Sequence, residues 1–319
     1  MERKIRVGVS SCLLGNPVRY DGNHKHESYL TEVLAAYFEF IPVCPEVECG
    51  LPVPREAMQL EGDPQQPRLV TIRTRVDLTE KMLSFCNNKV SRLENQDLCA
   101  FIFKKGSPSS GLHQVKVFSG SGSVSHKGRG LFAGEFISRF PYLPVEEEDC
   151  LHNAARRKNF MEQVFCCRRW KDFLHKSPNR QRLILFHQRH RLQVMAHSPG
   201  YLAKMDRLLS AEGTLKPEAV IKNYQAFLIR ALKVKPTAKK NSFVLKHISN
   251  RLKKFISKAE ESVLAELVES YTCLIVPLIA PLTLVNHYVN KYRVTGLLGQ
   301  TYLAPYPAEL MLNRPGEND

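Results

Sequence analysis

Hydrophobic and polar positions follow two different patterns along the chain, and the pattern changes near residue 150. In the first part, short apolar runs typical of buried strands alternate with segments whose apolar residues recur every three or four positions. These patterns predict strands at 5–9, 39–43, 69–72, 98–103, 115–118 and 143–145, and helices at 28–38, 77–93 and 130–140. Glycine and serine predict a loop over 119–130. The alternation of strands and helices favours a Rossmann-like α/β domain with a parallel sheet.

The rest of the chain shows helical patterns, separated by short loops that contain proline or glycine. They predict helices at 159–174, 180–197, 201–210, 217–232, 242–257, 260–271 and 277–292. We therefore expect an α/β domain at residues 1–149 and an all-α helical domain at residues 150–319, in keeping with the length of 319 residues. The acidic residues 146–149 are predicted to be an exposed run that closes the first domain.

The net charge of +15 is concentrated in the helical part. Residues 1–149 hold 18 Lys/Arg against 19 Asp/Glu, which leaves 28 against 12 in residues 150–319. A basic run is usually a solvated face, but here few acidic residues balance it, so we expect a surface that binds the phosphates of a nucleic acid. An anionic membrane surface is the second interpretation. The candidate RNA-binding residues are Arg180, Arg182, Arg189, Arg191, Lys239, Lys240, Lys246, Arg251, Lys253 and Lys254.

Two further features of the helical part have plainer interpretations. His187, His190 and His197 recur at helical spacing, which resembles the spacing of metal ligands, but we favour packing or RNA contact. The aromatic residues Tyr224, Phe243 and Phe255 are predicted to lie in the core rather than to stack on bases.

The nine cysteines and the polar amino-terminal segment, which lacks a secretory pattern, predict a cytoplasmic protein with reduced thiols. The most apolar run, residues 271–285, is too short to cross a bilayer easily and contains Pro277 and Pro281. We expect no membrane association, and the sequence indicates no protein partner.

Three of the predicted strands end in loops that carry Cys12, Cys44 and Ser110. Parallel strands present their carboxyl ends at one edge of a sheet, where ligands bind, so these loops are expected to converge. Thiolates are ligands for soft metals or iron–sulfur clusters. The plainer alternative is that the cysteines are ordinary buried thiols.

Five motifs in order resemble the thiouracil desulfidase family over residues 3–146: 9–15 (VSSCLLG), 18–22 (VRYDG), 42–46 (PVCPE), 50–55 (GLPVPR) and 104–111 (KKGSPSSG). Segments 186–199 and 276–282 resemble the YbgA-like helical domain. The combination is similar to bacterial tRNA 4-thiouridine desulfidases. The resemblance implies non-redox removal of sulfur from 4-thiouridine in tRNA, with a 4Fe–4S cluster held by three protein ligands and one open iron.

The resemblance also implies roles for individual residues. Cys12, Cys44 and position 110 are the cluster ligands, but this chain has Ser110 where the family has a cysteine. Three explanations stay open: an engineered serine, a natural change in which Ser110, Cys49 or a small molecule completes the shell, or loss of the cluster. The implied catalytic residues are Glu46 as the base, Lys104 for developing negative charge, and Ser107 and Ser109 as hydrogen-bond donors; the implied substrate-binding residues are Arg19, Tyr20 and Asp21.

Plainer roles compete with several of these assignments. Glu46 can cap a helix, Lys104 can extend its side chain from a strand end to solvent, and Asp21 can stabilise its own loop through an Asx turn. At the level of the whole chain, a catalytically impaired RNA-binding protein and a free-thiouracil desulfidase are the alternatives to the tRNA enzyme.

Overall fold

The computed structural model describes residues 4–119, 123–211 and 216–311. The chain divides into two compact units, Met1–Phe160 and Met161–Asp319, which are described separately below. The division falls eleven residues after the domain boundary expected at 149/150. That boundary stays a prediction.

The first unit contains the predicted parallel sheet. Its strands are β1 (Ile5–Ser10), β2 (Phe38–Val43), β5 (Ala100–Phe103) and β8 (Val145–Glu147), in the order β2-β1-β5-β8. All three pairings are parallel, and Val9 lies between Pro42 and Ile102. Every residue of β5 is buried, as its uninterrupted apolar sequence predicts for a strand covered on both faces. The carboxyl ends of β1, β2 and β5 therefore lie at one edge.

A second sheet was not predicted. It has the order β4-β3-β6-β7 and is formed by β3 (Met58–Asp63), β4 (Gln66–Thr71), β6 (Val115–Phe118) and β7 (Val124–Gly128). The β3–β4 and β6–β7 pairs are antiparallel, and β3–β6 is parallel. The predicted 119–130 loop is wrong where it overlaps β7, while residues 120–122 lie outside the described part of the chain. Most of β7 is not buried, so backbone pairing forms this edge strand without a hydrophobic pattern.

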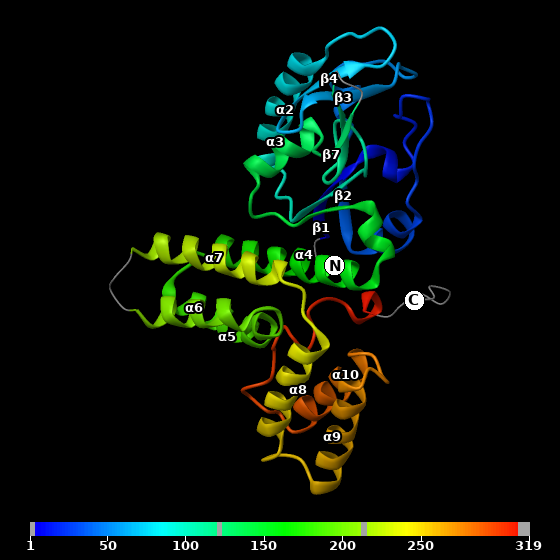
Figure 1. Cartoon of the computed structure of the whole chain (residues 1–319). Coiled ribbons are helices and arrows are strands. Elements are labelled where there is room, and N and C mark those ends of the chain that lie inside the picture. The colour runs from blue at the N-terminus through cyan, green and yellow to red at the C-terminus, as the bar shows by residue number, and fades with distance from the viewer. Residues whose placement is uncertain (1–3, 120–122, 212–215, 312–319) are drawn as a thin grey trace. The chain divides into compact units, whose positions relative to one another are not determined.

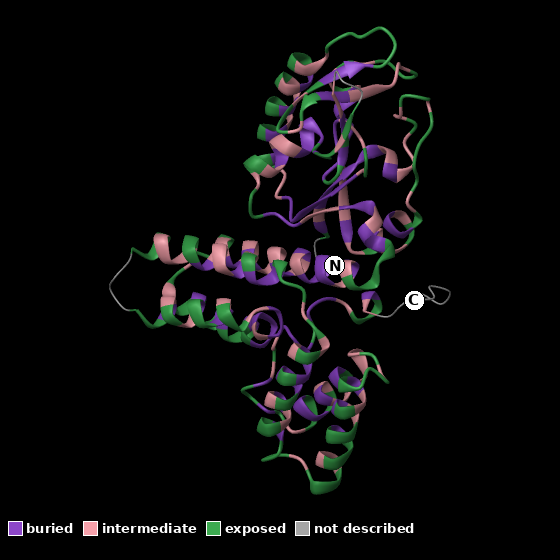
Figure 2. Ribbon diagram, in the orientation of Figure 1, coloured by how far each residue is buried: buried purple, intermediate pink, exposed green. Residues whose placement is uncertain are grey.

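Helices α2 (Thr79–Glu94) and α3 (Leu131–Arg139) lie side by side in the first unit (Figure 1). Helix α2 buries Met82, Cys86, Val90 and Leu93, which are the residues that its sequence pattern places on one face. The helix predicted at 28–38 is replaced by two short helical turns, Tyr29–Val33 and Leu34–Ala36. Figure 2 shows the buried strands at the centre of this unit.

The second unit is helical, as predicted. Its helices are α4 (Ala154–His175), which begins in the first unit, α5 (Arg180–His197), α6 (Pro199–Ser210), α7 (Pro217–Lys233), α8 (Ala238–Leu252), α9 (Lys258–Thr272) and α10 (Ile279–Lys291). Capping side chains mark several starts: Ser198 accepts from the Tyr201 amide, and Ser257 forms a reciprocal capping box with Glu260.

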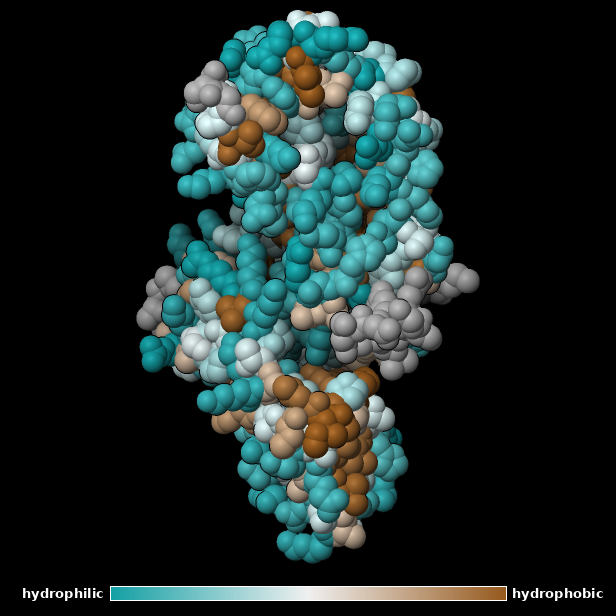
Figure 3. Space-filling view, turned by 45° about the vertical axis from the view of Figure 1, so that its right-hand side comes forward, coloured by the Kyte–Doolittle hydropathy of each residue, from teal (hydrophilic) through white to brown (hydrophobic). Residues whose placement is uncertain are grey.

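The aromatic side chains of this unit divide between core and surface. Tyr224 is fully buried, as predicted, and its ring stacks on that of Trp170. The same prediction is wrong for Phe243 and Phe255, which are 60% and 47% exposed. Figure 3 shows hydrophobic side chains gathered on one face of the region of α8 to α10. None of the helices described here is long and apolar enough to cross a bilayer.

Helix α3 begins directly against the loop that follows β5. The Phe132 amide donates to the Ser109 carbonyl oxygen at 2.9 Å, and the Gly130 amide donates to that of Gly111 at 2.8 Å. A Cβ atom at Gly130 would lie 2.4 Å from the Ser109 carbonyl carbon and oxygen, which is closer than atoms can approach. Glycine at 130 therefore permits the loop to rest on the helix.

We expect Gly130→Ala to lower the free energy of unfolding of the first unit by about 2–3 kcal/mol, because the backbone of the loop must move. Gly134→Ala is the matched control, since a Cβ there meets nothing within 4 Å and alanine favours a helix. Urea denaturation and hydrogen exchange of residues 104–114 measure both changes. Equal stability of the two variants would contradict this account of the packing.

Candidate active site

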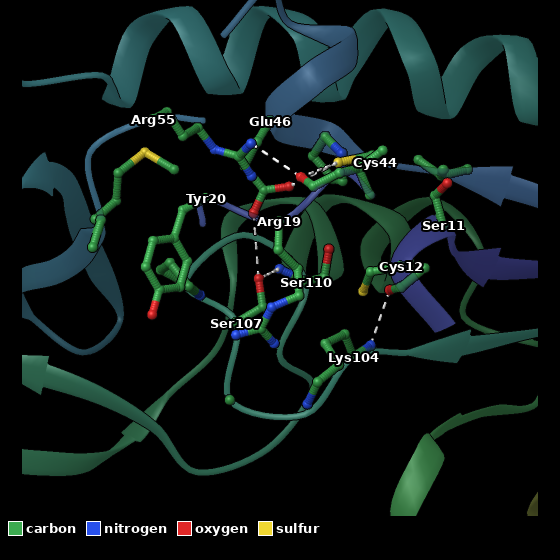
Figure 4. A pocket seen from close by; sticks show the side chains of 18 of the residues that line it. Ser11, Cys12, Arg19, Tyr20, Cys44, Glu46, Arg55, Lys104, Ser107 and Ser110 are labelled. Carbon is green, nitrogen blue, oxygen red and sulfur yellow. Dashed lines mark hydrogen bonds between the residues drawn. The ribbon is translucent and has the colours of Figure 1, made fainter. Parts of the chain in front are cut away.

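The loops after β1, β2 and β5 line one cavity of about 330 Å³. Cys12, Cys44 and Ser110 each contribute to its wall, together with Glu46 and Lys104. Figure 4 shows these five side chains around the same hollow. Residues that are far apart in the sequence are thus brought together at the edge where ligands bind in parallel sheets.

The two cysteines differ in their local structure, but both line the cavity and both are largely shielded from solvent. Cys12 lies on a short 3-10 helix, Ser11–Leu14, and Cys44 immediately precedes α1 (Pro45–Glu48). Burial, and then the nearby Glu46 carboxylate, raise the pKa of Cys12 to about 11 and that of Cys44 to about 12. The cations of Lys104 and Arg19 near Cys12, and of Arg55 near Cys44, oppose this rise in pKa but do not cancel it, so both thiols stay protonated at neutral pH.

Ser110 completes the third corner with a different kind of donor. Its side chain is buried, its amide donates to Ser107 Oγ at 3.1 Å, and its own Oγ lies 3.4 Å from Ser109 Oγ. Two thiols suit a soft metal or an iron–sulfur cluster, whereas a serine hydroxyl is a hard and weakly acidic ligand. Cys12 and Cys44 therefore suit a soft metal or an iron–sulfur cluster, but Ser110 does not supply the third thiolate.

Cys49 does not replace the missing thiol. Its Sγ donates to the backbone carbonyl oxygen of Glu46 at 3.1 Å, and it does not line the cavity. Within the described ranges, no three His, Cys, Asp or Glu side chains gather as a metal site. Of the three open explanations for Ser110, completion of the shell by Cys49 has no support in this geometry.

Glu46 is a buried carboxylate held by the loop after β5. Its Oε1 accepts from Ser109 Oγ at 2.5 Å and lies 3.5 Å from Ser107 Oγ. The plainer capping role belongs instead to Glu48, whose Oε1 accepts from the Cys44 amide at 2.8 Å. Ser109 is fully buried and does not line the cavity, so it positions Glu46 rather than contacting a ligand.

Lys104 lines the cavity with its cation paired. Its Nζ lies 2.6 Å from Glu148 Oε1 and donates to the Lys105 carbonyl oxygen at 2.7 Å. Its amide donates to Ser10 Oγ at 2.9 Å, which joins the end of β1 to the loop after β5. The lysine is therefore fixed on both its side chain and its backbone and does not simply extend to solvent.

The acidic residues at the end of β8 hold the Lys104–His113 loop. Glu148 accepts from the Lys105 amide at 2.6 Å, and Glu147 Oε1 accepts from the Leu112 and His113 amides at 2.9 and 3.1 Å. Glu147 and Glu148 are only 2% and 9% exposed, so the prediction of an exposed acidic run is wrong for both. In the sequence, charged residues after a strand look the same as a solvent-exposed turn. The backbone amides that donate to Glu147 and Glu148 lie 34 to 43 positions away, so no local pattern could indicate these hydrogen bonds.

Two of the three predicted substrate-binding residues line the cavity, and the third does not. Arg19 and Tyr20 line it, with the guanidinium 5.7 Å from the ring centroid. Asp21 does not line it; its carboxylate accepts from the Asn23 amide in the Asx turn that was the plainer alternative. Arg55 also lines the cavity and donates to the Val18 carbonyl oxygen at 3.0 Å. No role was predicted for Arg55, although the motif at 50–55 contains it.

The three histidines of the second unit are buried and engaged within the fold. His187 lies 2.9 Å from Asp206 Oδ1, His197 lies 2.5 Å from Glu162 Oε2, and His190 accepts from Arg169 Nε at 3.1 Å. Burial, followed by the Arg169 charge, lowers the pKa of His190 to about 3, so this ring is neutral. The packing interpretation therefore accounts for all three.

The ten candidate RNA-binding cations lie on the helices of the second unit and the turn after α8. Eight are exposed, while Arg180 and Lys240 are half-buried and bond to the carbonyl oxygens of Leu209 and His197. Arg191 and Lys253 form ion pairs with Asp206 and Glu261. Their role in RNA binding stays a prediction.

Comparisons with known proteins match the two parts of the chain separately. The family described as 2-thiouracil desulfurase matches residues 7–148, and the family described as protein of unknown function (DUF1722) matches residues 191–307. The uncharacterized protein YbgA of Escherichia coli K12 is 27% identical over 135 residues, which cover 42% of this chain and 80% of YbgA. A solved structure, the 4Fe–4S-dependent thiouracil desulfidase TudS, is 31% identical and covers 46% of this chain and 93% of its own, with a TM-score of 0.38. The predicted fusion of the two kinds of domain is confirmed.

We expect Glu148→Gln to lower the free energy of unfolding by about 2 kcal/mol, because the half-buried Lys104 cation loses its partner. Glu94→Gln is the control, since its ion pair with Arg139 is exposed and a much smaller loss follows from screening. Urea denaturation of both variants measures the difference, and hydrogen exchange of residues 104–114 should increase only for Glu148→Gln. Similar losses in the two variants would show that the pair does not hold the loop.

Proposed function

We propose that this chain, which joins a thiouracil desulfidase domain to a YbgA-like helical domain, removes sulfur from 4-thiouridine in tRNA to give uridine. The observation that carries the proposal is the convergence of Cys12, Cys44, position 110 and Glu46 on one cavity inside the segment matched by the 2-thiouracil desulfurase family. The reaction exchanges a thiocarbonyl and water for a carbonyl and hydrogen sulfide, so it needs no electron donor.

The proposed cofactor is a 4Fe–4S cluster with Cys12 and Cys44 as ligands. TudS is described as dependent on such a cluster, and the thiols of this chain are soft donors of the required kind. Ser110 does not supply the third thiolate, so the steps that the structure supports are those of the chain's own side chains. Replacement of oxygen by sulfur at position 110 would complete the donor set.

Glu46 is the proposed general base. Its carboxylate faces the cavity, with Oε1 fixed by the Ser109 hydroxyl and Oε2 at 3.5 Å from Cys44 Sγ, and it can take a proton from an attacking water. Lys104 places a cation in the same wall, where it stabilises negative charge that develops on the leaving sulfur. Glu148 positions that cation, while Arg19 and Tyr20 at the mouth provide a charged and an aromatic contact for a pyrimidine.

The helical domain is the proposed tRNA-binding part. Residues 150–319 hold 28 Lys/Arg and 12 Asp/Glu, and eight of the ten candidate cations are exposed. A surface of this kind binds the phosphate backbone without reading its sequence. The thiolated base must then leave its stack to enter the cavity.

A second function is favoured by one observation, the serine at position 110. In that alternative the chain binds RNA and no longer catalyses, because two thiols and a hydroxyl retain a cluster poorly. A free-thiouracil desulfidase would act on the base alone and would have no need of tRNA.

We expect Ser110→Cys to retain about four iron and four sulfide per chain after anaerobic reconstitution and to desulfurise 4-thiouridine in tRNA at least about tenfold faster than the parent. Iron and acid-labile sulfide analysis and loss of the thiouridine absorbance measure the two effects. The control is Ser110→Cys combined with Glu46→Gln, which should keep the metal content and lose about a hundredfold in rate.

The outcomes of this experiment separate the alternatives. Loading without turnover of tRNA or of free thiouracil would favour the RNA-binding alternative, and turnover of free thiouracil alone would favour the small-molecule enzyme. Full activity in the Glu46→Gln control would remove the base assignment.

We expect tRNA binding by the full-length chain to weaken steeply with salt, with a slope of log affinity against log salt of roughly −0.7 to −0.9 per phosphate contacted. Arg189→Gln combined with Lys254→Gln should lower the magnitude of the slope by about 1 to 2, whereas Lys116→Gln in the first unit should not change it. Filter binding over a series of salt concentrations measures the slope. An affinity that does not depend on salt would contradict backbone binding by the helical domain.

A further inference from the structure

Helix α8 exposes an aromatic ring on a surface that is otherwise polar and basic. Phe243 is 60% exposed, although the next two residues, Val244 and Leu245, are fully buried. A single exposed phenylalanine needs no partner, so its neighbours on the same face decide whether the ring has a role.

Helical geometry places Lys239, Phe243, Lys246 and Asn250 on one face. At 100° per residue these four positions fall within an arc of roughly 60°, and all four are exposed. The opposite face of α8 is buried and includes Val244, Leu245 and Ile248. We call these four exposed residues the α8 stripe; it extends over roughly 16 Å at 1.5 Å per residue.

The charges of the α8 stripe are uncompensated within the described residues. Helix α8 contains no acidic side chain, and neither Lys239 nor Lys246 forms an ion pair there. By contrast, Lys253 just beyond α8 pairs with Glu261 at 3.0 Å. The two free cations lie roughly 6 Å before and 4.5 Å after Phe243 along the helix axis.

We infer that the α8 stripe binds a single-stranded segment of RNA, with a base stacked on the Phe243 ring and the flanking phosphates on Lys239 and Lys246. The choice of RNA rests on the proposed function. Stacking on an aromatic side chain between cations is how proteins bind single strands without sequence preference, because every base has a π face. Asn250, further along the same face, can hydrogen-bond to a base edge.

The Phe243→Trp variant reports the stacked base directly. The chain has one tryptophan, Trp170, which is 3% exposed and gives a constant background. Adding a short oligouridylate should quench the emission of Phe243→Trp. Val263→Trp is the control, because Val263 is 52% exposed on α9 with Glu260 and Glu266 about one turn to either side, and its emission should not change.

Affinity measurements separate the contribution of the ring from that of the charges. Phe243→Ala should weaken oligouridylate binding by roughly 5- to 150-fold at every salt concentration, since the ring carries no charge. Lys239→Gln combined with Lys246→Gln should lower the magnitude of the salt slope by about 1.4, at roughly 0.7 per phosphate on a single strand. Inorganic polyphosphate, which lacks bases, should compete for binding without quenching Phe243→Trp.

Three results would overturn the inference: no quenching, equal quenching of Val263→Trp, or quenching by inorganic polyphosphate. A fourth result would also overturn it: emission of Phe243→Trp that changes with protein concentration in the absence of RNA would assign the α8 stripe to contact with a second copy of the chain. The binding measurements require no turnover, so an absence of desulfidase activity would not contradict RNA binding by the α8 stripe. Conversely, an absence of stacking would not contradict the proposed removal of sulfur from a thiolated base.

Discussion

The site depends on the way in which one loop obtains partners for the backbone amides at its two ends. The Lys104–His113 loop leaves the all-buried strand β5 and is held at both ends by neighbouring carboxylates, Glu148 at Lys105 and Glu147 at Leu112 and His113. Backbone amides shielded from water cost free energy when they lack partners, so these buried and part-buried contacts fix the path of the loop. The positions of Lys104, of the serines that hold Glu46 and of residue 110 all follow from that path.

The sequence allowed prediction of those parts of the fold in which hydrophobic periodicity dominates. The apolar residues of the amphipathic helix α2 recur at helical spacing, and the short apolar run of β5 is marked as a strand by its length and by the glycine and proline that follow it. The patterns did not indicate β7, which is formed by pairing with β6 and has little buried surface. They also misplaced Phe243, because an apolar residue type was taken to mean a buried one.

For the site, the order of strands and loops was sufficient to bring Cys12, Cys44 and Ser110 together, because parallel strands share one carboxyl edge. The supporting contacts were beyond prediction. The bonds from Ser109 to Glu46 and from Lys104 to Glu148 join residues separated by 63 and 44 positions, and such pairings depend on the final path of the backbone. Arg55 was missed for the same reason, since its carbonyl partner lies 37 positions away.

The support of the loop has a consequence for how this site can change through evolution. The loop is held by Glu147, by Glu148 and by close packing on Gly130, and these contacts use its backbone rather than the side chain at position 110. Exchange of one atom there, oxygen for sulfur, alters the ligand without disturbing the scaffold. Folding and metal chemistry are thus separable at this residue, and a single substitution can remove or restore a donor while the architecture persists.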